Sequence, residues 1–315
     1  MVVACATPPK PVTQAAESVM PRPVSKPATL NVVTANLHVG AGADAFSQDS
    51  IPESQVLSNL ERAVAILEKE KPDVFFLQEI DFRSRRTSYV DQEAWLVERT
   101  GYVASHAYTF DTRSMPPATV PTALRDCLFG LLVLTRETPD EVRIVELPNP
   151  PEQGTGAMDE KRVLLFVRLT LPDGNRVVVA NTHLNHISRQ ARLEQLEVIA
   201  GELEPESAWI LGGDFNEPWP FPKSLSQAWQ KRHDWLEWKP GFAPWFRKLG
   251  VLWPEFEALP TYPAKDPVVT IDHVFAAGRA SVIGRKRLDS EGSSDHHFVQ
   301  ARILVQPEEG EGEVQ

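Results

Sequence analysis

Short runs of apolar residues recur along the chain from residue 29 onward, and most of them end in polar side chains. The first run, 30–33, leads to Asn36, and the second, 73–77, leads to Gln78 and Glu79. The apolar residues are continuous within these runs, which is typical of strands that are buried on both faces. Further strands are predicted at 131–135, 163–171, 177–181, 209–213, 269–275 and 298–305.

Two segments between these strands have helical periodicity. Apolar residues recur at three- and four-residue spacing from Val56 to Leu67, and Pro72 ends that helix. A second helix is predicted from Ser188, its N-cap, to about Leu203. Many strands with few helices predict an α/β (α+β) fold in which two packed mixed β-sheets are flanked by helices. Such a sandwich places strand ends along one rim, where polar residues that are distant in sequence converge.

The chain divides by composition into three parts. Residues 1–28 are rich in proline and predict a disordered tether, 29–306 form one folded domain, and 307–315 form an acidic disordered tail. The segment Val2-Val3-Ala4-Cys5 is similar to the end of a bacterial lipoprotein signal, although a basic region and a long apolar stretch are missing. The alternatives are a lipid anchor on Cys5 with an extracytoplasmic location, or an accidental match in a disordered terminus of a cytoplasmic protein.

The charge balance limits the partners. The formal net charge is −11, from 32 basic and 43 acidic residues, which argues against a broad basic surface that holds nucleic acid. No run of apolar residues is long enough to span a bilayer. Cys5 and Cys127 are far apart in sequence and match no metal or redox spacing. We expect a monomer.

Polar clusters that follow the apolar runs carry the chemistry. They combine carboxylates, amides and imidazoles: Asn36, Gln78-Glu79, Thr182-His183, Asp214-Phe215-Asn216, Asp272-His273 and Asp295-His296-His297. Hard divalent cations prefer carboxylate and amide oxygens, while imidazoles and amides stabilise negative charge on a phosphoryl group. No serine elbow, P-loop, HExxH or Gly-rich dinucleotide motif competes with this pattern. The residue types therefore favour hydrolysis of a phosphate ester.

The motifs LQE, NTHL, GGDFN, IDH and SDHH occur in one chain in this order. At these residues, and over about 30–305, the chain resembles the endonuclease/exonuclease/phosphatase superfamily. That superfamily includes deoxyribonuclease I, abasic-site endonucleases, neutral sphingomyelinases and inositol-polyphosphate phosphatases. The resemblance implies a four-layered α/β sandwich of the DNase I-like kind, with 29–306 as the catalytic domain.

The resemblance also implies a metal site. Glu79 matches the main metal ligand of the family, Asn36 binds or orients the ion beside it, and Asp295 adds a further metal contact. The implied cofactor is Mg²⁺, or Mn²⁺ or Ca²⁺ in its place. One-ion and two-ion schemes use the same ligand types, so the number of ions stays open.

Catalytic roles follow in the same way. Asp214 matches the residue that orients and deprotonates the attacking water, and Asn216, two residues further on the same strand, contacts the phosphate. His296 matches the imidazole that stabilises the transition state. Asp272 matches the carboxylate that fixes the tautomer and charge of this imidazole.

Two further assignments concern the phosphate. His183 corresponds to a phosphate-binding histidine, and Arg162 stands where many members keep a phosphate-facing arginine. The chain departs from the family pattern at Leu131, where many members have a small polar residue. His183 therefore lacks an evident partner, for which Asp126 is a conjecture.

The other histidines are expected to have no part in catalysis. On a strand, His273 and His297 point away from the stronger residues that precede them, so we expect them to be structural. No motif supports the rest, which are expected to be solvated or hydrogen-bonded: His38, His106, His186 and His233.

Three hypotheses about the function and its substrate remain. The first is an extracytoplasmic phosphodiesterase that acts on a phospholipid headgroup or small phosphodiester, held at a membrane surface by its lipid anchor. The second is a deoxyribonuclease with nucleic acid as substrate, and the third is a catalytically silent binding protein. An aromatic-rich insertion at 219–256 either walls the site or, as we favour, packs against the sandwich. Arg83, Arg85 and Arg86 either touch an anionic substrate or lie in a solvated loop.

Overall fold

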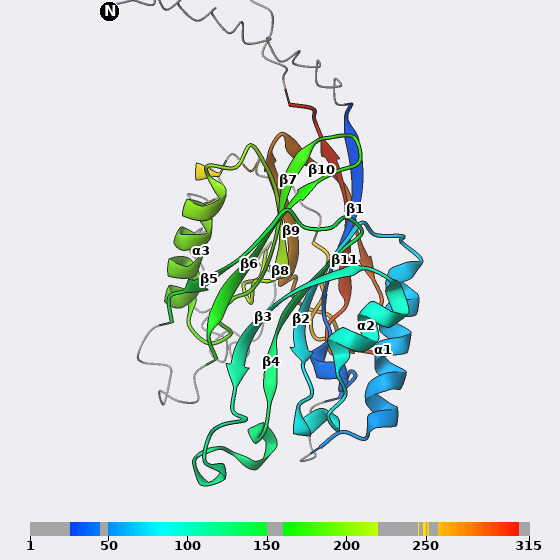
Figure 1. Ribbon diagram of the computed structural model, residues 1–315, viewed down its shortest axis with the longest axis vertical. Coiled ribbons are helices and arrows are strands. Elements are labelled where there is room, and N and C mark those ends of the chain that lie inside the picture. Colours follow the sequence, from blue (N-terminus) through cyan, green and yellow to red (C-terminus); the bar gives the residue numbers. More distant parts are fainter. Residues whose placement is uncertain are drawn as a thin grey trace, which may run out of the picture.

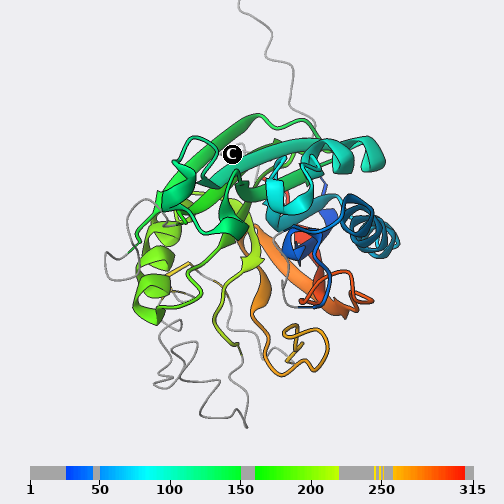
Figure 2. The same ribbon diagram turned by 90° about the horizontal axis from the view of Figure 1, so that it is seen from below.

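The computed structural model describes residues 26–44, 50–149, 160–219, 245, 248–249, 251 and 258–308. Two β-sheets pack face to face, and helices cover their outer faces, so that four layers are seen from two directions (Figures 1 and 2). The predicted sandwich is thereby confirmed. Most of the predicted tether with Cys5, most of the acidic tail and most of the aromatic insertion lie outside the described residues.

One sheet has six strands. In spatial order they are β10 (Ala280–Leu288), β11 (Phe298–Val305), β1 (Ala28–Asn36), β2 (Val74–Asp81), β4 (Leu128–Thr135) and β3 (Val103–Asp111). Only β1 and β2 run parallel to each other in this sheet, and the other neighbours are antiparallel.

The second sheet has five strands. In spatial order they are β5 (Glu141–Leu147), β6 (Arg162–Thr170), β7 (Arg176–His183), β8 (Ala208–Asp214) and β9 (Asp272–Gly278). Here β7 and β8 are the parallel pair. In both sheets a parallel pair lies inside the sheet, which agrees with the continuous apolar sequence of these strands.

Helices cover the two outer faces. On the six-stranded sheet lie α1 (Glu53–Glu68) and α2 (Gln92–Thr100), and on the five-stranded sheet lies α3 (Arg189–Leu203), as Figure 1 shows. The Ser188 side chain accepts a hydrogen bond from the Ala191 N–H, so its predicted N-cap role is confirmed. Short 3-10 turns are η1 (His38–Gly40), η2 (Arg85–Thr87), η3 (Pro117–Thr119) and η4 (Thr122–Leu124).

Among the described residues, no helix is both long and apolar enough to cross a membrane.

Two glycines allow close approaches beside Asp214, one to the opposite sheet and one to the neighbouring strand β7. A Cβ atom on Gly212 would lie 2.2 Å from the Phe76 ring of the opposite sheet, and one on Gly213 would lie 2.1 Å from the Thr182 carbonyl oxygen of β7. Gly213 also has a φ of 155°. Neither position has room for a side chain, so the Gly-Gly pair is required for β8 to carry Asp214 to this place.

We expect Gly213→Ala to lower the free energy of unfolding by about 2–4 kcal/mol, because the added methyl group must displace backbone. Gly201 is the matched control, since it lies in α3 and a Cβ atom added there would meet no neighbouring group within 4 Å. Gly201→Ala should stabilise the protein by about 0.5–1 kcal/mol. Urea unfolding of both variants measures the difference, and equal effects would contradict this account.

Candidate functional site

The polar clusters of the sequence meet at one end of the sandwich. Asn36, Glu79, His183 and Asp214 lie at or near the ends of β1, β2, β7 and β8, and Asp272 begins β9. This is the lower end of the molecule in Figure 1, and Figure 2 views the molecule from that side. Side chains from both sheets therefore contribute to one site, as the strand-end pattern predicts.

Asn36 connects the two acids that come from different sheets. Its Nδ2 atom donates to Oε1 of Glu79 at 3.0 Å and to Oδ2 of Asp214 at 3.2 Å. Its Oδ1 atom accepts a hydrogen bond from the His38 N–H at 3.0 Å. An amide oxygen has two lone pairs, so Oδ1 can still accept a further partner. Asn36 thus sets the spacing between Glu79 and Asp214.

A bulge in β2 aims Glu79 into the site. The pairing of β2 with β4 shifts between Leu77 and Ile80, so that Gln78 and Glu79 together oppose a single residue of β4. Glu79 has a φ of 55°, which is uncommon for a residue with a side chain. Gln78 is fully buried and donates to the Asn181 side chain of the other sheet at 2.7 Å. Gln78 therefore joins the sheets directly beneath Glu79.

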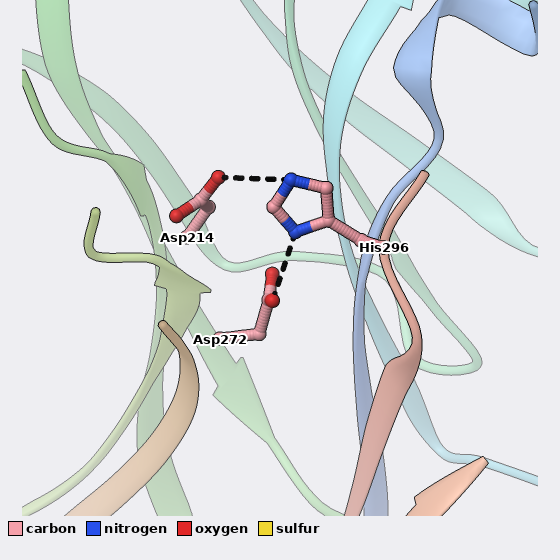
Figure 3. Close-up of side chains that lie close together, drawn as sticks. All are labelled: Asp214, Asp272 and His296. Carbon is pink, nitrogen blue, oxygen red and sulfur yellow. Dashed lines mark hydrogen bonds and ion pairs between the residues drawn. The ribbon is translucent and has the colours of Figure 1, made fainter. Parts of the chain in front are cut away.

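Asp214, His296 and Asp272 form a compact group (Figure 3). Nδ1 of His296 lies 2.9 Å from Oδ2 of Asp272, and Nε2 of His296 lies 3.8 Å from Oδ2 of Asp214. All three side chains are almost completely buried. Figure 3 shows the imidazole between the two carboxylates, so each ring nitrogen has a different acid beside it.

The charges of this group perturb its ionisation. Burial raises the pKa of Asp214 to about 7, and the charge of Asp272 adds to this effect against the opposing charge of His296. Burial alone would lower the pKa of His296, but the charge and hydrogen bond of Asp272, with Asp214 and Asp295, raise it well above its usual value. Asp214 therefore suits proton acceptance near neutral pH, and His296 suits a cationic role.

His183 also lies beside Asp214. Its Nε2 atom is 3.5 Å from Oδ2 of Asp214. Burial and the charge of Arg162 lower its pKa well below the usual value, which favours a neutral ring. Its Nδ1 atom is buried and has no hydrogen-bond partner among the described residues. The conjecture that Asp126 is its partner is therefore wrong, and Asp126 instead accepts a hydrogen bond from the Tyr89 hydroxyl at 2.7 Å.

Arg162 lies beside His183 but is engaged by the protein. Its guanidinium donates to the His183 carbonyl oxygen at 3.3 Å and lies 2.9 Å from Oε2 of Glu160 and 3.1 Å from Nδ1 of His186. Burial raises the pKa of Glu160, and the nearby charge of Glu79 adds to this effect. Arg162 is thus buried and forms an ion pair with a partly exposed carboxylate.

The strand that carries Asp214 ends there, which corrects the predicted direction of Asn216. Asn216 has a φ of 50°, so the chain turns after β8, and Asn216 does not continue along the strand. Its backbone N–H donates to Oδ1 of Asp214 at 2.9 Å, and its Nδ2 atom donates to the Leu184 carbonyl oxygen at 3.0 Å. Asn216 therefore holds Asp214 and the end of β7 in place.

The match to a protein family covers all of these motifs. A family model described as the Endonuclease/Exonuclease/phosphatase family matches residues 33–296, which include every site residue described above. The chain belongs to this family. Members of the endonuclease/exonuclease/phosphatase family act as metal-dependent phosphoesterases or nucleases and generally hydrolyse phosphoester bonds.

Solved structures with the same fold are numerous. An endonuclease/exonuclease/phosphatase from Beutenbergia cavernae DSM 12333 has a TM-score of 0.67 and 24% identity, and the match covers 88% of this chain and 72% of that chain. A mannosyl-6-phosphatase of Bacteroides thetaiotaomicron VPI-5482 has a TM-score of 0.53 and 15% identity, and the match covers 87% of this chain and 99% of that chain. ANGEL2, a 2′,3′-cyclic phosphatase, has a TM-score of 0.58 and 16% identity, and the match covers 88% of this chain and 95% of that chain. No curated protein matches the chain by sequence.

Family members typically use a divalent metal ion, and the donor set of this chain fits one. Glu79, Asn36, Asp214 and Asp295 offer oxygen atoms of the kind that hard cations prefer. Burial and the charge of Glu79 raise the pKa of Asp295, as burial raises that of Asp214. Burial and a neighbouring carboxylate disfavour the ionised form of each acid, and a bound cation would offset both effects.

A second grouping of possible ligands overlaps this set. Atoms of Asp214, Asp272 and His296 that could bind a metal all lie within 4.8 Å of one another. Asp272 favours the cationic form of His296, whose pKa is raised well above its usual value, and a cationic imidazole has no lone pair for a metal ion, so this pair suits proton handling rather than metal binding. We therefore place Glu79, Asn36 and Asp295 as the residues that would hold the ion, with Asp214 beside them.

His273 and His297, which we expected to be structural, make packing and backbone contacts. His273 is buried with its ring against Phe215 and Phe275, and burial lowers its pKa to about 4. Nδ1 of His297 accepts a hydrogen bond from the Ser290 N–H at 3.1 Å.

Several residues near the site were not predicted. Glu160 pairs with Arg162, and the Tyr262 ring lies 4.7 Å from the His296 ring, measured between centroids. His38, which we expected to have a bland role, lies with Nδ1 3.5 Å from Oδ1 of Asp295. A usable signal was present for two of them, since Glu160 and His38 each stand two residues from a predicted site residue.

Proposed function

We propose that the chain is a divalent-metal-dependent phosphodiesterase that hydrolyses its substrate by in-line attack of water. The observation that carries the proposal is the position of one buried carboxylate atom. Oδ2 of Asp214 lies 3.2 Å from Nδ2 of Asn36, 3.5 Å from Nε2 of His183 and 3.8 Å from Nε2 of His296. This proton-accepting oxygen thus has a neutral imidazole and a cationic imidazole beside it.

The side chains would divide the reaction among them. Asp214 accepts the proton of the attacking water as its oxygen bonds to phosphorus, and the Asn216 N–H holds the other oxygen of Asp214 in place. The ester P–O bond opposite the attacking water breaks, and the alcohol leaves with a proton from solvent. His296, kept cationic by Asp272, stabilises the charge that develops on the phosphoryl oxygens. His183 binds an oxygen of the same group. A divalent ion held by Glu79, Asn36 and Asp295, Mg²⁺ by our prediction, supplies Lewis-acid polarisation of the phosphate when bound.

The charge balance supports a diester over a monoester. Arg162 is paired with Glu160, and Arg86 is paired with Asp81 at 2.8 Å, so neither arginine brings an uncompensated positive charge. A phosphodiester carries a single negative charge and makes a smaller demand on the site than a doubly charged monoester. Both kinds occur among proteins of this fold, since one neighbour is a mannosyl-6-phosphatase and another a 2′,3′-cyclic phosphatase. A phospholipid headgroup or small phosphodiester remains our proposed substrate class.

Hydrolysis of bis(p-nitrophenyl) phosphate and p-nitrophenyl phosphate, with and without Mg²⁺, tests the proposal. We expect metal-dependent turnover that favours the diester and that falls at least about 10²-fold in His296→Ala. His297→Gln is the matched control, because His297 is the adjacent histidine and its ring bonds to the Ser290 backbone. Preference for the monoester would overturn the diester assignment. Turnover that does not depend on a metal, or that survives in His296→Ala, would overturn the mechanism.

Cys5 and the segment before it bear on the location of the protein. We propose an extracytoplasmic protein that is anchored through Cys5 and is monomeric. Incorporation of labelled palmitate by the full chain but not by Cys5→Ala tests the anchor, and absence of label in both would remove it.

A further inference from the structure

One fully buried arginine of α3 bonds to two chain segments that each follow a site residue. Arg192 donates from Nε to Oε2 of Glu217 at 2.8 Å and from Nη1 to the Asn185 carbonyl oxygen at 3.1 Å. Asn185 stands two residues after His183, and Glu217 stands three residues after Asp214. Arg192 therefore joins the chain beyond the ends of β7 and β8, where these two strands no longer pair with each other.

α3 also holds the backbone N–H of Asn185. This group donates to Oε1 of Gln195 at 2.9 Å, so two side chains of α3 bond to the backbone of one residue. Oδ1 of Asn185 accepts from the N–H groups of Ile187 and Ser188, both at 2.8 Å, and this forms the turn that leads into α3. The position of the segment directly after His183 is thus set by α3.

The Glu217 carboxylate is held by α3 as well. Its Oε1 atom accepts from Nε of Arg189 at 2.9 Å, and its Oε2 atom accepts from Arg192. The side chain of Arg192 is 0% exposed and that of Glu217 is 1% exposed. The chain after Asp214 is therefore tied to the same helix as the chain after His183.

Stability alone does not account for a buried ion pair of this kind. Removing a guanidinium and a carboxylate from water is costly, and apolar residues of similar volume often give equal or greater stability. The hydrogen bonds of the pair differ from apolar packing because they have direction and fix the distance between the groups that they join. Here they fix the spacing between Asn185 and Glu217.

The spacing of these strand ends determines how His183 meets Asp214. Nε2 of His183 lies 3.5 Å from Oδ2 of Asp214. Two backbone groups of Leu184 bond to the end of β8, because its N–H donates to the Asp214 carbonyl oxygen at 2.9 Å and its carbonyl oxygen accepts from Nδ2 of Asn216 at 3.0 Å. Arg192 continues this series of links one residue further along each segment.

We propose that Arg192 and Glu217 are positioning residues, which fix His183 against Asp214 and do not touch the substrate. This rests on the proposed function, because that reaction requires the two side chains to be aligned. Alignment matters most in the transition state, in which Asp214 takes the proton of water while His183 binds a phosphoryl oxygen. Loss of the pair therefore lowers kcat more than it raises KM.

Kinetics of Arg192→Met and of the double variant Arg192→Met/Glu217→Leu test the proposal, with bis(p-nitrophenyl) phosphate and Mg²⁺. The single variant leaves the buried Glu217 carboxylate without Arg192 and should melt well below the wild type. The double variant should recover most of this stability, because apolar side chains replace both charges. We expect kcat to fall about 10- to 100-fold in both variants and KM to change less than about threefold. A pair that only stabilised the fold would not lower kcat in the stable double variant.

The ion pair of Arg168 and Glu206 supplies the matched control. Arg168 lies on β6 and donates to Glu206, just beyond the C-terminal end of α3, at 2.7 and 2.9 Å. This pair joins α3 to the same sheet, but at the opposite end of the helix from Arg192. Arg168→Met/Glu206→Leu should therefore keep the wild-type kcat. Recovery of the wild-type kcat in Arg192→Met/Glu217→Leu, or an equal loss in the control, would overturn the proposal.

A crystal structure of the Arg192→Met/Glu217→Leu variant tests the same point without turnover. We expect the distance between Nε2 of His183 and Oδ2 of Asp214 to exceed the 3.5 Å of the wild type by about 1 Å. An unchanged distance would overturn the positioning role and leave the proposed function intact. If the wild type has no metal-dependent turnover, the proposed function fails, and this distance still decides whether the pair fixes the two side chains.

Discussion

Asp214→Asn is expected to lower kcat for a phosphodiester at least about 10³-fold and to raise the melting temperature of the metal-free protein. The loss of turnover follows because asparagine cannot accept a proton from water. The gain in stability follows because the wild-type carboxylate is buried and its pKa is raised to about 7. A site that is built for catalysis often lowers stability in this way.

The sign of the pH dependence is fixed by the direction of that shift. A carboxyl whose pKa is raised by folding is destabilising when ionised, so wild-type Asp214 lowers stability increasingly as pH rises from about 4 to 7. The asparagine variant has no such ionisation. The difference in melting temperature should thus be small near pH 4 and reach roughly 5 °C, or about 2 kcal/mol, above pH 7. Thermal melts in EDTA from pH 4 to 8 measure it.

Asp81→Asn is the matched control, because it makes the same chemical change at another buried acid. Asp81 accepts three hydrogen bonds from the Arg86 guanidinium, so its substitution leaves Arg86 without its counter-charge. We expect this variant to be destabilised by about 3 kcal/mol or more. If Asp214→Asn melts below the wild type as Asp81→Asn does, the burial of Asp214 is not a stability cost. Unchanged kcat would remove Asp214 as the base.

Asp272→Asn is expected to lower kcat about 10²- to 10³-fold, because His296 then loses the acid that keeps it cationic. Burial would lower the pKa of His296 without that acid, and Asp272 is the largest of the effects that raise it. Activity that needs cationic His296 disappears as pH rises through this pKa. The alkaline limb of the kcat profile should therefore move to lower pH in the variant.

Nuclear magnetic resonance of the imidazole carbons in the metal-free protein measures the His296 titration directly. Asp289→Asn serves as the control, since Asp289 is also next to a histidine, with Oδ1 3.8 Å from Nδ1 of His297, but is exposed and away from Asp214. It should leave kcat and the His296 titration unchanged. A titration of His296 that stays the same in Asp272→Asn would contradict the pairing.

The buried strands could be predicted from the sequence, whereas most edge strands could not. β1, β2, β4, β6, β7, β8 and β11 were each predicted from continuous apolar runs. The strands that were missed, β3, β5 and β10, are all at sheet edges. An edge strand has one neighbour and more solvent, so polar and charged residues interrupt its apolar pattern, as in β10 with its Arg285, Lys286 and Arg287. The helix α2 was missed because only Gln92 and Leu96 are buried on it.

The site divides in the same way. Motif residues such as Asp214 and His296 could be predicted because acids and imidazoles after apolar runs have few structural reasons to be there. The residues that hold the backbone next to the site could not, since Gln92 and Asn59 lie on segments without a motif and bind the Val39 and Gly40 carbonyl groups through contacts that only the fold creates. The turn at Asn216 depends on a single backbone angle, which no pattern of residue types specifies.

Each sheet carries half of the site, and this makes the position of one sheet on the other a catalytic variable. Asn36 and Glu79 belong to one sheet and His296 directly precedes its strand β11, while His183, Asp214 and Asp272 belong to the other. The apolar contacts between the sheets have no preferred direction of their own, unlike a hydrogen bond. The hydrogen bond from Gln78 to Asn181 is directional and fixes the position of one sheet relative to the other. Loops around the rim can therefore diverge to suit new substrates without disturbing the alignment on which the chemistry depends.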